Sequence, residues 1–301
     1  MTGAVPAAYG ASTTNRRPRA TQAEMAARYA ALIAITRRVQ PASVRAVFYQ
    51  ASIHGVVGKD EAGYRRVQRD LVMLRQTGHI PFGWIVDGTR WMRKPRTYGG
   101  MAEALDETAR LYRRALWRRA PVYCEIWLEK DALAGTIFPV TARYDVPLLV
   151  ARGYASLSFL HDAAESIAAD DRPVVILHLG DFDPSGVDAA RNIEETLRRF
   201  APRAHITFRR LAVTEEQIAA YGLPTRPTKT TDSRARRWGE RDSVELDAMD
   251  PNVLRAMVQA EIEDLLPAHE MAVLREAEAS ERKALHFIAQ GYADGADEVS
   301  P

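Results

Sequence analysis

The sequence predicts an α/β protein with a helical N-terminal part and a C-terminal part built around a parallel sheet. Apolar residues recur at helical spacing up to about residue 77, whereas short apolar runs typical of buried strands alternate with helical stretches after Pro121. The chain has 301 residues, 47% of them hydrophobic, so it is long enough for two hydrophobic cores. We divide it into a flexible basic arm at 1–21, a helical domain at 22–120, a sheet domain at 121–250 and a helical extension at 251–301.

Three helices are expected in the first domain. The first spans 22–39, and the second begins near Ser43, which is a suitable N-cap. The third spans 61–77 and carries its apolar residues on one stripe, and Gly78 ends it. Three arginines of this helix lie outside the stripe and are candidate DNA contacts, namely Arg65, Arg66 and Arg69.

A hairpin is expected after the third helix. Apolar runs at 80–86 and 89–92 are separated by Asp87-Gly88, a strong hairpin signal. Three helices followed by a small hairpin is the order of a winged helix of the CAP-like type, with 61–77 in the position of the recognition helix. Taken alone, the three helices fit a generic helical domain with a charged face slightly better. A further basic helix is expected to end near 118–119.

The second domain is expected to be a parallel sheet flanked by helices. Its strands are expected at 122–128, 147–151, 173–179 and 206–213, and its helices near 131–142, 156–168 and 186–200. Right-handed crossovers connect such strands, and a ligand then binds at their carboxyl ends. A loop rich in Pro and Arg follows, then a short strand at 244–246 and a mostly helical tail from Asn252.

The two halves of the chain carry opposite charge. Residues 1–120 hold 21 Lys and Arg against 8 Asp and Glu, and residues 121–301 hold 20 against 31. A basic segment attracts a polyanion such as DNA, whereas an acidic segment binds cations or stays solvated. Solvated arginine-rich helix faces would give the same totals, so charge alone does not decide the question.

The sequence argues against disulfide bonds, a cysteine-based zinc site, a membrane helix and a signal peptide. The single cysteine, Cys124, rules out an internal disulfide and a zinc site made of several cysteines. No run approaches the roughly 18 apolar residues of a membrane helix, and the N-terminal residues lack the apolar core of a signal peptide. We therefore expect a cytoplasmic, nucleoid-associated protein without a membrane contact.

Three carboxylates follow two of the expected strands. Glu129 comes directly after 122–128, and Asp181 and Asp183 come just after 173–179. The carboxyl ends of parallel strands meet at one edge of a sheet, and side chains two residues apart point to one side, so the three acids are expected to converge. Three hard oxygen ligands without His or Cys suit Mg²⁺, for which Mn²⁺ is a substitute.

Each acid taken singly has a simpler explanation. Asp183 is well placed as the N-cap of the next helix, whose first turn suits Pro184, and Glu129 fits an exposed acid at a strand end. As a set, the acids resemble the Toprim domain of topoisomerases, bacterial primases and certain nucleases. The signature of that domain is a Glu after one strand and an Asp-x-Asp after a later one, and the resemblance implies that Glu129, Asp181 and Asp183 hold Mg²⁺.

A candidate nucleophile lies in the second helix. Arg45 and Tyr49 are four residues apart and share a helix face, so the guanidinium can lie beside the phenol and a phosphate. A phenol, with a pKa of about 10, needs a nearby cation to react as a phenolate at neutral pH. A helical tyrosine with apolar neighbours is more often part of the core, so the pair gains weight only from its context.

In domain order the chain resembles the A subunit of topoisomerase VI, a type IIB topoisomerase, and the meiotic relative that makes DNA double-strand breaks. The resemblance covers residues 25–250 and rests on RAVFY, GHIPFGWIVDGTR, LEKDAL, GDFDPSG and VELDAM. It implies that Tyr49 attacks duplex DNA and becomes linked to a 5′ phosphate with the help of Arg45. It also implies a homodimer that cuts both strands, with each active site built from two protomers.

Departures from that family indicate a stand-alone minimal member or a dedicated break-making enzyme. The chain is short for such an A subunit, and residues 55–60 do not have the spacing of a phosphate-binding loop. ATP-driven strand passage would therefore need a separate ATPase B-type subunit. Two other functions stay open, a Toprim nuclease that uses metal-activated water, and a non-catalytic winged-helix protein that only binds DNA.

Residues near the expected site allow two interpretations each. Glu245 and Asp247 extend the metal site or face solvent, and His178 is expected to be a core histidine rather than a ligand. The basic loop before Val244 clamps DNA or pairs with acidic residues, and we favour DNA. The candidates in that loop are Arg234, Arg236 and Arg237.

Overall fold

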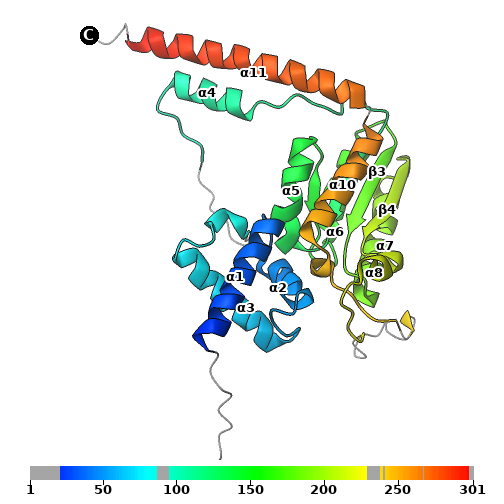
Figure 1. Ribbon diagram of the computed structural model, residues 1–301. Helices are drawn as coiled ribbons and strands as arrows, with labels where there is room; N and C mark the ends of the chain where they lie inside the picture. The colour runs from blue at the N-terminus through cyan, green and yellow to red at the C-terminus, as the bar shows by residue number, and fades with distance from the viewer. Residues whose placement is uncertain (1–20, 87–94, 229–237, 240, 267, 298–301) are drawn as a thin grey trace, which may run out of the picture.

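The computed structural model describes residues 21–86, 95–228, 238–239, 241–266 and 268–297 (Figure 1). Three helices come first, a four-stranded parallel sheet with helices on both faces follows, and two helices, the second of them the longest described, end the described chain. The expected α/β class with a parallel sheet flanked by helices is therefore confirmed. The basic arm expected at 1–21 lies, except for Thr21, outside the described residues.

The N-terminal helices begin where their capping residues predict. Helix α1 spans Gln22–Val39, α2 spans Val44–Ile53 and α3 spans Glu61–Gln76. The side chain of Ser43 accepts a hydrogen bond from the backbone N–H of Ala46 at 3.1 Å, which satisfies one of the free donors at the start of α2.

The prediction of a first hairpin strand at 80–86 is wrong. Residues Phe82–Trp84 form a short 3-10 helix, η1, and Ile85 makes a single parallel bridge with Ala42. The physical reason is Pro81, which has no N–H to give to a strand ladder and whose fixed φ favours the turn that follows. The second strand, expected at 89–92, lies outside the described residues.

All four strands of the expected sheet are present. They are β1 at Tyr123–Leu128, β2 at Leu148–Val150, β3 at Val174–Leu179 and β4 at Ile206–Ala212, arranged in the order β2-β1-β3-β4. Every neighbouring pair is parallel. The strands begin and end near the predicted residues because uninterrupted apolar runs mark strands that are covered on both faces.

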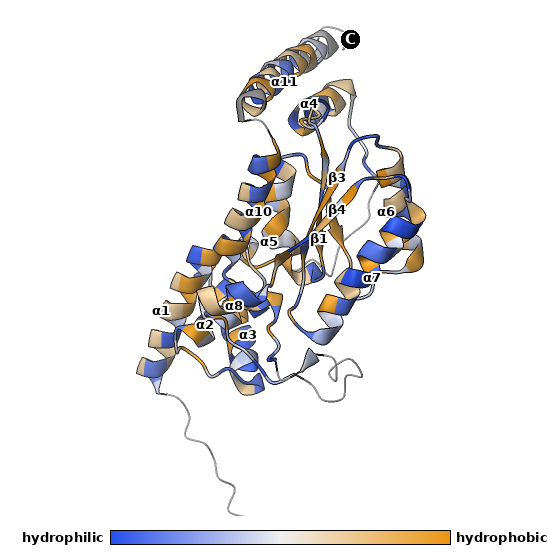
Figure 2. Ribbon diagram, turned by 90° about the vertical axis from the view of Figure 1, so that its right-hand side faces the viewer, coloured by the Kyte–Doolittle hydropathy of each residue, from blue (hydrophilic) through white to orange (hydrophobic). Residues whose placement is uncertain are grey.

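Helices cover the two faces of the sheet (Figure 1). Helices α6 at Leu157–Ala168 and α7 at Pro184–Phe200 bury their apolar residues against one face. Helices α5 at Ala134–Arg143 and α10 at Pro251–Leu265 pack on the other. In Figure 2 the strands are mostly hydrophobic, and the hydrophilic residues of α6 and α7 lie on their outer sides. A shorter helix, α8 at Glu215–Tyr221, follows β4.

The N-terminal helices and the sheet share one hydrophobic core. A single cluster of buried residues contains Leu32, Val47 and Leu71 of α1–α3 together with Ile126 and Leu177 of the sheet. The helices are therefore packed against the sheet, and this brings α2 close to the carboxyl ends of the strands.

Two expected elements near the C-terminal half differ from the structure. The basic helix expected to end near 118–119 is α4, which spans Met101–Leu111 and ends earlier. The strand expected at 244–246 is a single antiparallel bridge between Val244 and Phe182, followed by the 3-10 helix η3 at Leu246–Ala248. Backbone hydrogen bonds between Val244 and Phe182, which a local pattern does not contain, decide the second of these differences.

The last helix, α11 at Ala268–Asp297, packs along α4 and lies across one end of the molecule (Figure 1). A short 3-10 helix, η2 at Asp131–Leu133, connects β1 to α5. Among the helices of the described chain, none combines the length and apolar character that crossing a membrane requires.

Candidate functional site

Glu129 and Asp181 meet at the carboxyl edge of the sheet, as the sequence predicts. Leu128 of β1 pairs with Leu179 of β3, so both strands end at the same level. A carboxylate oxygen of Glu129 then accepts a hydrogen bond from the backbone N–H of Asp181 at 2.9 Å. Asp181 is buried, with 9% of its surface exposed.

Gly180 permits this close approach. A Cβ atom at Gly180 would lie 2.6 Å from Oε2 of Glu129 and 2.6 Å from Cε1 of His178, which is nearer than side-chain carbons come to other atoms. The missing side chain therefore lets the Glu129 carboxylate lie directly against the backbone between β3 and α7.

Asp183 has the capping role that its position suggests. Its carboxylate accepts a hydrogen bond from the backbone N–H of Gly186 at 2.7 Å, and Pro184 occupies the first turn of α7. Among the described residues, Glu129, Asp181 and Asp183 do not form a trio whose carboxylate oxygens all lie within 4.8 Å of one another. The three acids lie at one edge of the sheet, but each carboxylate is bonded to a different partner in the protein.

A lysine occupies the space between the acids. The Nζ atom of Lys130 lies 3.0 Å from a carboxylate oxygen of Asp181, 3.1 Å from Glu245 and 2.9 Å from Asp247. Glu245 and Asp247 are 7% and 1% exposed, so the interpretation that they face solvent is wrong. They join the acids at the sheet edge and form, with Lys130 and Asp181, a buried charged group.

A single backbone bridge positions these two acids. Phe182 and Val244 exchange two backbone hydrogen bonds of 2.8 and 2.9 Å, so the segment after Val244 runs beside Asp181. The backbone N–H of Leu246 donates to Oδ1 of Asp181 at 2.8 Å. A segment distant in sequence thus completes the site.

Arginines balance part of the negative charge. A guanidinium nitrogen of Arg45 lies 3.0 Å from one carboxylate oxygen of Glu245, and one of Arg226 lies 2.6 Å from the other. These cations, with Lys130, outweigh the effect of burial and lower the pKa of Glu245 to about 2. Glu245 is therefore ionised at neutral pH.

Glu129 is electrostatically different from Glu245. Burial, followed by the negative charge of Asp181, raises the pKa of Glu129 to about 7. Burial also raises the pKa of Asp181, against the opposing effect of Lys130. Carboxylate oxygens are the ligand type that a hard divalent cation such as Mg²⁺ prefers. In the present arrangement, however, Lys130 is the cation paired with Asp181, and the three predicted ligands are not gathered around one point.

Tyr49 lies near these charges but within the core. It is 7% exposed, and its ring packs near the ring of Phe48 at 5.4 Å between centroids. Burial, followed by the charge of Glu245, raises the pKa of its phenol to about 12, although Lys130 and Arg45 act in the opposite direction. The Nζ atom of Lys59 lies 5.8 Å from the centre of the Tyr49 ring.

A cleft of about 720 Å³ opens beside the acids, between the N-terminal helices and the sheet edge. Its walls include Arg45, Glu129 and Lys130. A second tyrosine, Tyr64 of α3, also lines the cleft, and the Arg45 guanidinium lies 5.5 Å from the centre of its ring. Tyr49 is not among the residues that line this cleft.

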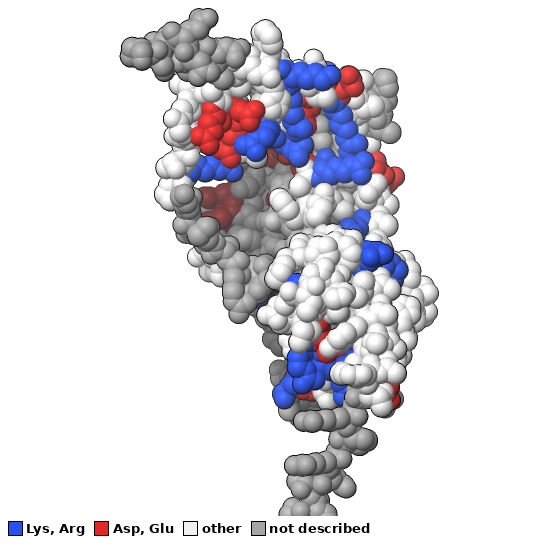
Figure 3. Space-filling model, turned by 60° about the vertical axis from the view of Figure 1, so that its left-hand side comes forward, with Lys and Arg blue, Asp and Glu red and all other residues white. Residues whose placement is uncertain are grey.

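The arginines predicted on α3 are exposed. Arg66 and Arg69 line a second cavity of about 1090 Å³ beside α1, whereas Arg65 forms a surface ion pair with Glu61 at 3.1 Å. Figure 3 shows Lys and Arg side chains gathered at the lower end of the molecule, where the N-terminal helices lie. Three further predicted DNA contacts lie outside the described residues, namely Arg234, Arg236 and Arg237.

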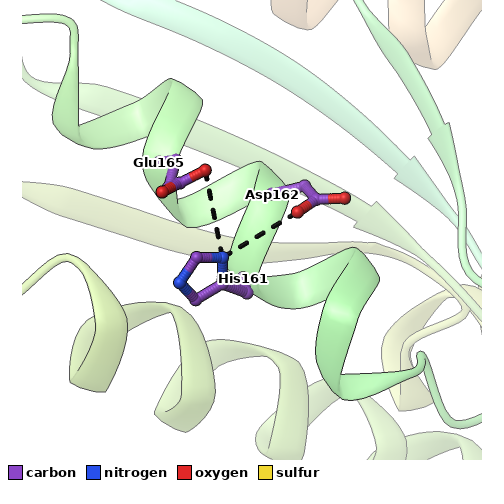
Figure 4. A group of neighbouring side chains, drawn as sticks. All are labelled: His161, Asp162 and Glu165. Carbon is purple, nitrogen blue, oxygen red and sulfur yellow. Dashed lines mark ion pairs between the residues drawn. The ribbon is translucent and has the colours of Figure 1, made fainter.

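A different acidic group is present on α6 (Figure 4). His161 lies 3.8 Å from Asp162 and 3.9 Å from Glu165, and it is the one set of three or more candidate ligands in the described chain that gathers within 4.8 Å. All three residues are exposed on a helix surface. Such groups are common without an ion, so this cluster is not part of the candidate site.

Sequence reasoning missed Lys130 and left Glu245 and Asp247 undecided. The available signal was a lysine next to a strand-end glutamate, in LEKDAL, and an alternating pair of acids in VELDAM. Neither pattern predicts that Lys130 pairs with Glu245 and Asp247, because these two segments are far apart in the sequence and come together only in the folded protein.

Comparison of the sequence with protein-family models and with curated proteins identified no match.

Proposed function

We propose that this protein is a Mg²⁺-dependent DNA-cleaving enzyme of the topoisomerase VI A-subunit type, with a winged-helix part and a Toprim part. The observation that carries the proposal is the charged edge of the sheet at an open cleft. Glu129, which follows β1, lines this cleft together with Arg45, and Arg45 is paired with the buried Glu245. Acidic and cationic groups side by side suit a phosphodiester, which needs its charge neutralised while a bond to phosphorus breaks.

The carboxylates Glu129, Asp181 and Asp183 would hold the cation in this proposal, with Mn²⁺ as a substitute for Mg²⁺. When bound, a divalent cation supplies positive charge for the phosphate oxygens at the scissile position. Glu245 and Asp247 are already paired with Lys130 and the arginines, so their role is to position these basic groups.

Tyr49 is the proposed nucleophile. Its phenol oxygen bonds to phosphorus, the bond between phosphorus and the 3′ oxygen breaks, and the 5′ phosphate stays on the tyrosine. The phenol proton is lost and the departing 3′ oxygen gains one, so a phosphodiester is exchanged for a phosphotyrosyl diester and the step is reversible. Lys130 and Arg45 are the described cations whose charge favours the phenolate of Tyr49.

Arg45 and the acidic edge of the sheet lie together within one chain. The ion pair between Arg45 and Glu245 ties α2 to the acidic edge within one protomer. A homodimer in this proposal carries two complete sites, one for each DNA strand, and a separate ATPase B-type subunit would supply strand passage.

A water-dependent nuclease is the second candidate, and one observation favours it. Tyr49 is 7% exposed and its pKa is raised to about 12, whereas Glu129 borders the cleft with a pKa of about 7. A carboxyl group with that pKa suits a general base that activates water at neutral pH. Cleavage would then yield free ends with no protein attached.

The deciding experiment traps covalent protein–DNA adducts on duplex DNA with Mg²⁺ or Mn²⁺. Tyr49→Phe should abolish the adducts, whereas Tyr64→Phe, a matched change at the other tyrosine beside Arg45, should retain them. Adducts that persist in Tyr49→Phe contradict the nucleophile. Free nicks that survive Tyr49→Phe and disappear in Asp181→Ala support the nuclease, and DNA binding without cleavage under any divalent ion supports a non-catalytic protein.

A further inference from the structure

One face of α11 is exposed where burial is described, and it carries several large apolar side chains. The opposite face packs against α4, where His286 lies 3.0 Å from Asp106 and Arg282 donates to the backbone carbonyl of Tyr112 at 2.8 Å. The outward residues include large apolar side chains with 48–77% of their surface exposed, namely Val273, Phe287, Ile288 and Tyr292.

The exposed residues follow a coiled-coil spacing. Alternating steps of three and four residues connect the exposed positions Val273, Glu276, Ser280, Lys283 and Phe287. Smaller exposed residues lie beside these five positions, namely Ala272, Ala279 and Ala284. Small side chains between the large ones let a second helix approach closely. We call these eight residues the α11 seam.

The α11 seam is complementary to itself in an antiparallel arrangement. Val273 and Phe287 lie seven residues on either side of Ser280, so a two-fold axis at Ser280 sets Val273 opposite the partner's Phe287. Glu276 and Lys283 lie four and three residues from the same centre, and the helical rise of about 1.5 Å per residue keeps them adjacent across the pair. Neither of these charged residues forms an ion pair with another residue in the described ranges.

We propose that the α11 seam binds the same seam of a second copy of this chain, in an antiparallel pair centred on Ser280. Each pair would bury two Val273–Phe287 contacts and form two ion pairs between Glu276 and Lys283. This names a surface for the homodimer of the proposed function. It does not depend on DNA cleavage, because it rests on α11 alone.

Charge complementarity is the reason for assigning a second copy rather than another protein. Along the α11 seam the positions are apolar, acidic, small, basic and apolar in turn. A two-fold pair sets the apolar and acidic half of one seam against the basic and apolar half of the other, and an unrelated protein is not constrained to have this complementary order.

Cysteine crosslinking tests the axis directly in the full-length protein without DNA or metal. Ser280→Cys should form an intermolecular disulfide under mild oxidation, because a residue on the axis faces its own copy. Cys124 is buried, so it does not compete. Ser166→Cys, at an exposed serine of α6, is the matched control and should form no intermolecular disulfide. Equal, low crosslinking of both variants overturns the proposal.

A charge exchange measured by sedimentation tests the register. Glu276→Lys and Lys283→Glu should each raise the dimer dissociation constant about tenfold, because each creates two repulsive contacts. The double exchange should return it to within about threefold of the parent value. A double variant as weak as the singles overturns the register. These outcomes are independent of adduct formation, so failure of the cleavage proposal leaves them readable.

Discussion

The ammonium group of Lys130 lies 2.9 Å from a carboxylate oxygen of Asp247, a residue 1% exposed and far along the chain from Lys130. Lys130 follows β1 directly, whereas Asp247 belongs to η3, which the bridge between Val244 and Phe182 brings to the sheet edge. This contact joins two segments and neutralises acids that would otherwise repel one another.

Replacing this lysine should destabilise the fold. Lys130→Met leaves Asp181, Glu245 and Asp247 without their shared cation, and we expect the free energy of unfolding to fall by about 3 kcal/mol. Urea denaturation measures the change. Mg²⁺ should restore more stability to Lys130→Met than to the parent protein, because an added cation relieves the same repulsion.

The control for this prediction is Arg65→Met, which removes an exposed ion pair with Glu61. Such surface pairs contribute about 0 to 1 kcal/mol, so the control should stay close to the parent. Equal stability of Lys130→Met and Arg65→Met would show that the buried charged group does not stabilise the protein.

A methyl group at Gly180 should displace Glu129. The Cβ of Gly180→Ala would lie 2.6 Å from Oε2 of Glu129, so the carboxylate must leave the backbone N–H of Asp181. We expect Mg²⁺ affinity, measured by calorimetry, to fall about tenfold or more while the protein stays folded by circular dichroism. Gly83→Ala, where the added atom has open space, is the control. Unchanged affinity in Gly180→Ala would exclude Glu129 as a ligand.

Stability should decrease below about pH 6.5 because of His178. Burial, followed by the charge of Arg210, lowers the pKa of His178 to about 3 from its usual 6.5, and the ring stacks on Phe208 at 5.6 Å between centroids. Between these two pH values the unfolded chain binds more protons than the folded one, so stability is full above pH 6.5 and is lost as the pH falls toward 3.

At pH 4.5 this loss should amount to about 3 kcal/mol for His178 alone. Urea denaturation at pH 7.5 and pH 4.5 measures it. His178→Phe removes the titrating group, so its stability should change less between the two pH values than that of the parent. A pH dependence as steep in the variant as in the parent would assign the effect to other groups.

DNA affinity should depend on the arginines of α3. Arg66→Gln and Arg69→Gln each remove one cation beside the second cavity, and each should reduce the slope of log affinity against log salt by about 0.9 if the arginine contacts a phosphate. Fluorescence anisotropy with a duplex at several salt concentrations gives the slopes. Arg198→Gln on α7, whose arginine is paired with Glu194, should leave the slope unchanged.

Much of the fold could be predicted because its signals are local. The apolar runs of β1–β4 marked strands covered on both faces, and Ser43 and Asp183 cap the helices that their positions suggested. The strand expected at 80–86 failed because a run of apolar residues does not reveal that Pro81 lacks a donor where a strand would need one.

The sequence by itself determined the parallel sheet and the convergence of Glu129 and Asp181 at its edge, because strand order and chain direction place successive strand ends together. Only the tertiary structure decided that Lys130 sits among Asp181, Glu245 and Asp247, and that Tyr49 lies in the core while Tyr64 borders the cleft. The physical reason is distance along the chain: burial and ion pairs between remote segments arise from packing, and no local pattern encodes them.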